Sequence, residues 1–112
     1  MKIDDLENYS IEINEKYMRY YYSSEAKLLK NITTQYDLKE NLEIPTFVSP
    51  ITITSFLSVD DEIYGIYLEY CDKDYNLKTV ELNFDSTIEI ELTEGNDDVH
   101  RTSVCTLRII EK

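Results

Sequence analysis

Hydrophobic and polar residues alternate one by one in the second half of the chain. The alternation is clearest in three stretches, residues 80–84, 88–92 and 105–109. A period of two places every second side chain on a core and the others in water, which is typical of antiparallel sheets with one solvated face. These stretches are therefore expected to be strands.

Two further segments carry β signals of other kinds. Residues 51–54 are rich in β-branched side chains, and residues 63–71 form a long apolar and aromatic run. Turn-forming residues occupy 72–76 and 94–98, between the expected strands. The pattern predicts an antiparallel meander of four or five strands over residues 51–112.

In the first part of the chain, hydrophobic side chains recur at a longer spacing. Side chains that could line one face of a helix recur there at spacings of three and four residues: they are Ile13, Tyr17, Tyr20 or Tyr21, Ser24, Leu28 and Ile32. A second interpretation starts from Ile11 and Ile13, which alternate with polar residues. It makes residues 9–22 a strand and begins a helix at Ser23 or Ser24. The helix is the preferred interpretation.

The expected elements fit one domain. The chain has 112 residues, of which 42% are hydrophobic, enough to bury a single core. The predicted organisation is a mainly helical part over residues 1–38, a connection over 39–50 and a sheet over 51–112. The predicted fold class is α+β, with one or two N-terminal helices packed on the apolar face of the meander.

Charge is distributed unevenly along this acidic chain. The net charge is −12; residues 1–58 contain nine acids and six bases, whereas residues 59–112 contain fourteen acids and five bases. Such a field repels nucleic acid and anionic membranes and attracts basic proteins. We therefore expect a basic protein as partner, with no direct binding of nucleic acid or membrane.

The acids of the second half follow the strand pattern. Tyr64, Ile66 and Leu68 are expected to face the core, so that Tyr67 and Glu69 face solvent. Neighbouring strands lie about 4.8 Å apart, and the outward carboxylates would then form a two-dimensional array. The candidate protein-binding face consists of Asp60, Asp61, Glu62, Tyr67, Glu69, Asp72, Asp74, Glu81, Asp85, Glu89 and Glu91.

A dense carboxylate array can imitate a polyanion and so compete for a surface that binds nucleic acid. In size and charge the chain is similar to inhibitor proteins that cover the basic surface of a nuclease: immunity, anti-restriction and anti-CRISPR proteins. This similarity implies a nucleic-acid mimic whose carboxylates speed association, with Tyr67 as a contact residue that holds the complex. Two alternatives are a structural or assembly protein that forms a homo-oligomer and a domain that binds a small ligand or a cation.

The sequence offers few residues for metal binding or catalysis. Asp72-x-Asp74-x-Asn76 resembles the start of a calcium loop, but Leu77 stands where that loop needs its turn glycine. The single histidine, His100, and the two separated cysteines lack zinc-ligand spacing. Nucleophile-elbow, P-loop, dinucleotide-binding and H-E-x-x-H motifs are all absent from the sequence. We expect a binding protein without cofactor or metal rather than an enzyme.

The expected localisation is cytoplasmic. The first ten residues carry acids where a signal peptide requires an apolar run, and no stretch approaches the ~18 apolar residues of a membrane span. Cys71 and Cys105 are then expected to be reduced, buried thiols. A disulfide between them would require their strands to be adjacent.

Overall fold

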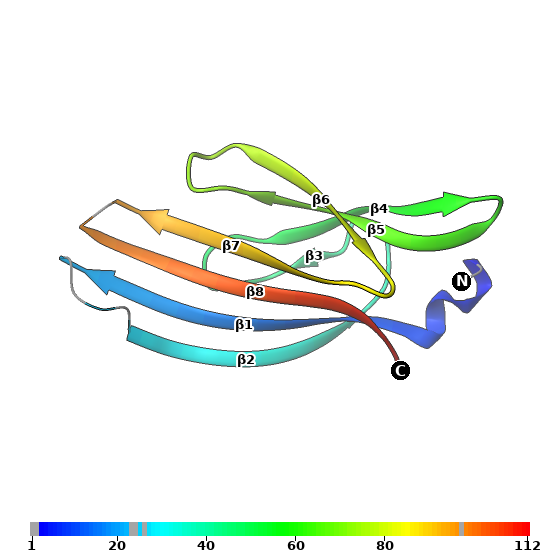
Figure 1. The fold of residues 1–112 in the computed structure, drawn as a ribbon, viewed down its shortest axis with the longest axis horizontal. Helices are drawn as coiled ribbons and strands as arrows, with labels where there is room; N and C mark the ends of the chain where they lie inside the picture. Colours follow the sequence, from blue (N-terminus) through cyan, green and yellow to red (C-terminus); the bar gives the residue numbers. More distant parts are fainter. Residues whose placement is uncertain (1–2, 23–24, 26, 97) are drawn as a thin grey trace.

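The computed structural model describes residues 3–22, 25, 27–96 and 98–112. This part of the chain contains eight β-strands and one short 3₁₀-helix, joined by turns and loops (Figure 1). The helix η1 spans Ile3–Asn8. The strands are β1 (Tyr9–Tyr21), β2 (Lys27–Asp37), β3 (Glu43–Ile44), β4 (Ile51–Val59), β5 (Glu62–Cys71), β6 (Leu77–Asn83), β7 (Thr87–Gly95) and β8 (Val99–Glu111).

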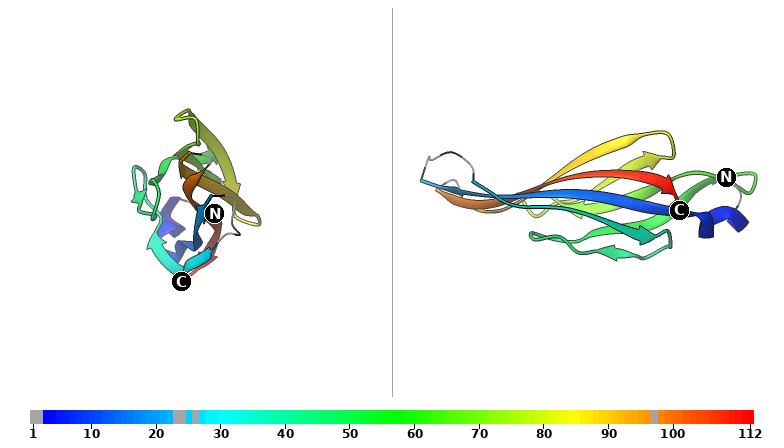
Figure 2. Two further views of the ribbon diagram at one scale, coloured as in Figure 1. Left: turned by 90° about the vertical axis from the view of Figure 1, so that its left-hand side faces the viewer. Right: turned by 90° about the horizontal axis from the view of Figure 1, so that it is seen from below.

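The strands form two four-stranded antiparallel sheets. Sheet A has the order β3-β4-β5-β6, and sheet B has the order β2-β1-β8-β7. The two sheets pack against each other as an elongated sandwich of 52 × 27 × 19 Å (Figure 2). The longest pairing joins β1 to β8 without interruption, from Tyr9 opposite Glu111 to Tyr21 opposite Val99.

The predicted α+β class is wrong: the described residues are almost all in strands, and the described part of residues 1–38 contains no helix longer than the six-residue 3₁₀-helix η1. Instead β1 and β2 make an antiparallel pair inside sheet B. Ile11, Ile13, Glu15 and Tyr17 are buried, whereas the alternate residues Glu12, Asn14 and Lys16 are more exposed, as a strand requires. The misleading signal was a spacing of four residues, which fits a helical face and is also a multiple of the strand period.

The alternative interpretation of the N-terminal segment was half right. A strand over residues 9–22 corresponds to β1. The helix that was to follow it is wrong, since β2 covers most of that segment; its expected start, Ser23 or Ser24, lies outside the described residues. No helix in the described chain is long and apolar enough to span a membrane.

The strands expected in the second half are present, but the single meander is not. After β6 the chain crosses to the other sheet, so that β7 and β8 join β1 and β2 in sheet B. The crossing is short: the amide of Phe84 still bonds to the carbonyl of Tyr64, at 3.2 Å, and the amide of Ser86 closes a turn on Asn83, at 3.1 Å. Within the expected connection 39–50, β3 pairs with the start of β4.

The core lies between the two sheets and draws on both. Its buried members are aliphatic except for one thiol: they are Ile11, Ile13, Leu38, Ile44, Ile51, Ile53, Ile66, Leu68, Leu82, Ile90, Leu92, Cys105, Leu107 and Ile109. Cys105 on β8 is buried and Cys71 on β5 is only partly buried; both thiols are free, and they lie on strands of different sheets.

Candidate functional site

The predicted binding face is divided between the two sheets. Tyr67 and Glu69 lie on β5, where Tyr67 stands directly opposite Glu81 of β6, all three on the side of sheet A that faces away from the core. Glu89 and Glu91 lie on β7, on the outer side of sheet B. The chain crossing after β6 separates the two groups, so the expected single plane of carboxylates is not formed.

Tyr64, which was expected to face the core, is 46% exposed. The register between β4 and β5 shifts at this point: Leu57 pairs with Gly65 and Ser58 with Ile63, which leaves Tyr64 as an extra residue. A bulge of this kind turns a side chain away from the face that the strand period predicts.

The remaining predicted residues lie in turns or at the start of a strand. Asp60 and Asp61 form the β4–β5 turn with positive φ angles of 50° and 62°, and Glu62 is the first residue of β5. Asp72 and Asp74 form the β5–β6 turn at the other end of the hairpin, while Asp85 lies between β6 and β7.

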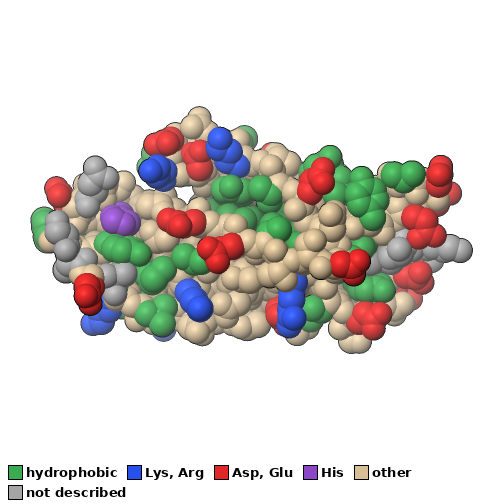
Figure 3. All heavy atoms as spheres, in the orientation of Figure 1, with side chains coloured by type: hydrophobic (Ala, Val, Ile, Leu, Met, Phe, Trp, Pro, Cys, Tyr) green, Lys and Arg blue, Asp and Glu red, His purple; other side chains and the backbone are tan. Residues whose placement is uncertain are grey.

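The edge strands β6 and β7 bring four of the predicted acids to one side of the sandwich. Glu81 is on β6, Asp85 is in the connection, and Glu89 and Glu91 are on β7. We call these four residues the β6–β7 acidic side. All four are solvent-accessible, and acidic side chains lie over both strands in the space-filling view (Figure 3).

No ion pair found within the described residues involves the β6–β7 acidic side. Among the described residues the ion pairs join other acids to cations: they are Lys78–Asp72, Arg101–Glu94, Arg108–Glu12 and Lys112–Asp37. A carboxylate without an internal cation keeps its charge available for a partner, and its hydration is the main cost of docking.

Tyr67 lies next to the β6–β7 acidic side, because it stands directly opposite Glu81 of β6. The carboxylate of Glu81 raises the pKa of Tyr67, and partial burial raises it further. The phenol therefore stays neutral and can donate a hydrogen bond while its ring offers apolar area, a combination common at the centre of interfaces.

The calcium-like segment is a hairpin turn. The Oδ1 atom of Asp72 accepts hydrogen bonds from the backbone amides of Asp74 and Asn76, both at 2.9 Å. These amide bonds lower the pKa of Asp72, and Lys78 adds to the effect. In the part of the chain that can be described, no three His, Cys, Asp or Glu side chains are grouped as metal ligands would be.

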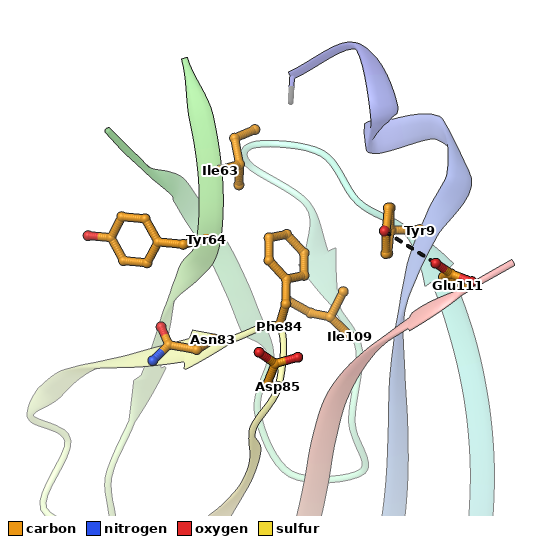
Figure 4. Close-up of a pocket in the computed structure, with 8 residues that line it drawn as sticks. All are labelled: Tyr9, Ile63, Tyr64, Asn83, Phe84, Asp85, Ile109 and Glu111. Carbon is orange, nitrogen blue, oxygen red and sulfur yellow. Dashed lines mark hydrogen bonds between the residues drawn. The ribbon is translucent and has the colours of Figure 1, made fainter. Parts of the chain in front are cut away.

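A cleft of about 640 Å³ opens at the end of β6 that leads into β7. Phe84 points toward Ile63 across it, and the ring of Tyr9 lies 5.6 Å from that of Phe84 (Figure 4). The Tyr9 hydroxyl donates a 3.4 Å hydrogen bond to Glu111 at the rim. The cleft is open and mixed in polarity, and its lining includes the carboxylates of Asp85 and Glu111.

Sequence reasoning missed a cluster of arginines and tyrosines at the end of sheet B. Arg19 and Arg101 stand directly opposite each other on β1 and β8, and Arg19 donates a 2.9 Å hydrogen bond to the Tyr21 hydroxyl. Burial raises the pKa of Tyr17, but hydrogen bonds from Arg19 and Arg101 outweigh it and lower that pKa. The strand interpretation of residues 9–22 would have placed Tyr17, Arg19 and Tyr21 on one side.

Comparison of the chain with known protein families, with characterised proteins and with solved structures finds no match.

Proposed function

We propose that the protein is an acidic binding module that docks its β6–β7 acidic side onto the basic surface of another protein. The partner class that fits this chemistry is a nucleic-acid-handling protein, whose cationic surface a row of carboxylates would cover in competition with phosphates. The proposal rests on one observation: Glu81, Asp85, Glu89 and Glu91 lie on two edge strands and the short connection between them, and no described ion pair involves these four residues.

The docking surface is narrower than a full sheet face. Tyr67 and Glu69 continue it over sheet A, and Asp74 continues it at the β5–β6 turn. The carboxylates would accelerate association by long-range attraction, and the Tyr67 ring would provide contact area that slows dissociation.

The test uses affinity capture from source-cell extract with three baits. The first is the unchanged protein; the second carries Glu81→Gln, Asp85→Asn, Glu89→Gln and Glu91→Gln. The third carries the same change of charge at exposed acids elsewhere: Glu7→Gln, Glu25→Gln, Glu40→Gln and Glu43→Gln. The proposal requires a basic protein that the first and third baits retain at low salt and the second loses.

The interaction is then measured with purified partner. We expect the association rate to fall steeply with ionic strength, because exposed charges are screened beyond about 8 Å in physiological salt. A rate independent of salt, or equal binding by all three baits, would refute docking through the β6–β7 acidic side.

A further inference from the structure

The cleft at the end of β6 opens between the two sheets (Figure 4). Residues of both sheets line it, and its inner end is apolar, because Ile63 of β5 and Ile109 of β8 are only 1% and 7% exposed. Clefts that bind small molecules usually have volumes of roughly 300–1,000 Å³. With about 640 Å³, this cleft has the size of a small-molecule site.

Two aromatic rings form a wall of the cleft. Tyr9 begins β1 and Phe84 follows β6, and their ring centroids lie 5.6 Å apart with the planes inclined by 49°. Both rings are partly buried and pack against the core. The Phe84 amide donates a 3.2 Å hydrogen bond to the carbonyl of Tyr64, which fixes the backbone at this ring. Aromatic faces attract apolar groups by contact and cations through the ring quadrupole, so the wall suits a ligand that carries both.

The rim of the cleft is acidic. Asp85 and Glu111 line it and are both exposed, and Glu111 accepts the 3.4 Å hydrogen bond of the Tyr9 hydroxyl. Partial burial raises the pKa of Tyr9, and the carboxylates of Glu111 and Asp5 raise it further. The Tyr9 phenol therefore stays neutral, and Asp5 adds a third negative charge near this rim.

No described cation neutralises the two carboxylates that line the rim. Neither Asp85 nor Glu111 takes part in an ion pair among the described residues. The cations nearest to Glu111 in sequence have other partners: Arg108 and Lys112 pair with acids of β1 and β2, at 2.8 and 2.7 Å. Carboxylates beside low-dielectric walls attract cationic ligands. The cleft is thus complementary to a positive charge at its rim and to an apolar group at its inner end.

We propose that the cleft binds a small organic amine, whose apolar body lies against Ile63 and Phe84 and whose ammonium group lies at Asp85 and Glu111. Charge-assisted hydrogen bonds to the carboxylates would hold the ammonium group. The order of polarity selects a free amine over a lysine side chain of another protein. A lysine carries its charge at the tip of an apolar stem, so it would enter charge first and place the ammonium group at the apolar end.

This inference is independent of the proposed docking onto a basic protein, because the two depend on different acids. Glu111 belongs to the cleft alone, Glu89 and Glu91 belong to the β6–β7 acidic side alone, and Asp85 belongs to both. Glu111→Gln should therefore weaken amine binding and leave the capture of a basic protein unchanged. Glu89→Gln with Glu91→Gln should do the reverse, so either proposal can fail without the other.

The first test titrates the full chain with phenethylammonium, which has an apolar ring at one end and a charge at the other. Backbone amide shifts are followed by NMR. We expect saturable shifts at Phe84, Asp85 and Ile109 with a Kd of about 1 mM or below, as the size of this ligand allows. Absence of saturable binding, or shifts confined to another part of the chain, overturns the proposal.

Four comparison compounds each change one property of the ligand. They are 2-phenylethanol without the charge, 3-phenylpropanoate with the opposite charge, methylammonium without the apolar body, and Nα-acetyl-lysine methylamide as a protein-like amine. Each should bind at least about tenfold more weakly than phenethylammonium. Equal binding by the alcohol or the carboxylate would mean that the rim acids do not select charge. Equal binding by methylammonium would mean that they attract any cation, and equal binding by the lysine derivative would refute the assignment to a free amine.

The second test changes the cleft. Glu111→Gln and Asp85→Asn, at exposed positions, should each weaken phenethylammonium binding by about fivefold or more. Phe84→Leu keeps an apolar side chain but removes the aromatic face, and it should weaken binding too. The matched control is Glu89→Gln, exposed on β7 and outside the cleft lining, which should bind like the unchanged protein. Circular dichroism checks each fold. Unchanged affinity in Glu111→Gln, or an equal loss in Glu89→Gln, overturns the proposal.

Discussion

Glu15 on β1 and Ser103 on β8 are joined by a hydrogen bond of 2.5 Å inside the sandwich, from the serine hydroxyl to the carboxylate. The same carboxylate oxygen accepts the backbone amide of Phe47 at 2.8 Å, and the ring of Phe47 stacks on that of Tyr17, with centroids 5.1 Å apart. A buried carboxylate is tolerated only where donors compensate its lost hydration. Glu15 thus fastens the connection that precedes β4 to the inner side of sheet B.

Replacing Glu15 should destabilise the fold. Because Glu15 is 7% exposed, Glu15→Ala leaves the Phe47 amide and the Ser103 hydroxyl without an acceptor and should lower the free energy of unfolding by about 2–4 kcal/mol. Glu15→Gln keeps an acceptor oxygen and should cost about half as much. Urea unfolding measures both. Glu40→Ala, at an exposed position, is the control and should stay within about 0.5 kcal/mol; equal values for all three would contradict the link.

The Cys105 thiol should be inert in the folded protein. Burial raises the pKa of Cys105 to about 12, and the nearby Glu15 carboxylate contributes. Since the thiolate is the reactive form, alkylation of the native protein near pH 8 should modify Cys71 and leave Cys105 untouched until urea unfolds the chain. Mass spectrometry of the labelled peptides reads this out. Rapid labelling of Cys105 in the native state would refute it.

The same thiol should make stability fall at alkaline pH. Its pKa is raised in the folded state from an ordinary value of 9.0, so the unfolded chain loses the proton first as pH rises. Stability is therefore full below pH 9 and declines between pH 9 and about 12, by up to about 1.4 kcal/mol per pH unit. Cys105→Val should flatten this part of the unfolding profile relative to the unchanged protein. An identical slope in both proteins would contradict the assignment.

The strands of the second half could be predicted because hydrophobic and polar residues alternate there one by one, a pattern that fits a strand and not a helix. Val80, Leu82, Ile90 and Leu92 all face the core as expected, the first of them partly buried. The N-terminal strands could not be distinguished from a helix as clearly, since Tyr17 lies four residues after Ile13 and both periods accept that spacing. Period-2 alternation also says nothing about which sheet a strand joins.

That limit explains the divided binding face. Glu81 and Glu89 were assigned to one plane because their strands are consecutive in sequence, and consecutive strands usually pair. In the structure, their strands β6 and β7 are edge strands of different sheets. The short crossing around Asp85 moves the chain from sheet A to sheet B and so separates the two strands. No local pattern in the sequence predicts this crossing. The bulge at Tyr64 is a second tertiary feature of this kind.

Gly65 controls how closely β6 approaches β5. It stands opposite Asn83, and a Cβ atom at Gly65 would lie 2.6 Å from the backbone oxygen of Leu82. Gly65→Ala should therefore push the strands apart and lower the free energy of unfolding by about 1–3 kcal/mol. Because Glu81 moves with β6, the substitution should also weaken binding of a basic partner. Thermal melting measures the first effect; the control Ser58→Ala, at an exposed position of β4, should melt like the unchanged protein.

Asp72 should make the β5–β6 turn sensitive to acid. Its carboxylate holds the amides of Asn76 and Asp74, and these bonds lower the pKa of Asp72 below its ordinary 3.8. A lowered pKa means that its stabilising effect is present above pH 3.8 and is lost as pH falls through the folded-state value. Asp72→Ala should reduce the melting temperature at neutral pH. Asp72→Asn should reduce it less, because the amide oxygen of asparagine can still accept the two backbone hydrogen bonds, although the attraction to Lys78 is lost. The melting temperatures of Asp72→Ala and the unchanged protein should converge below that value; a gap that persists in acid would mean that the carboxylate does not hold the turn.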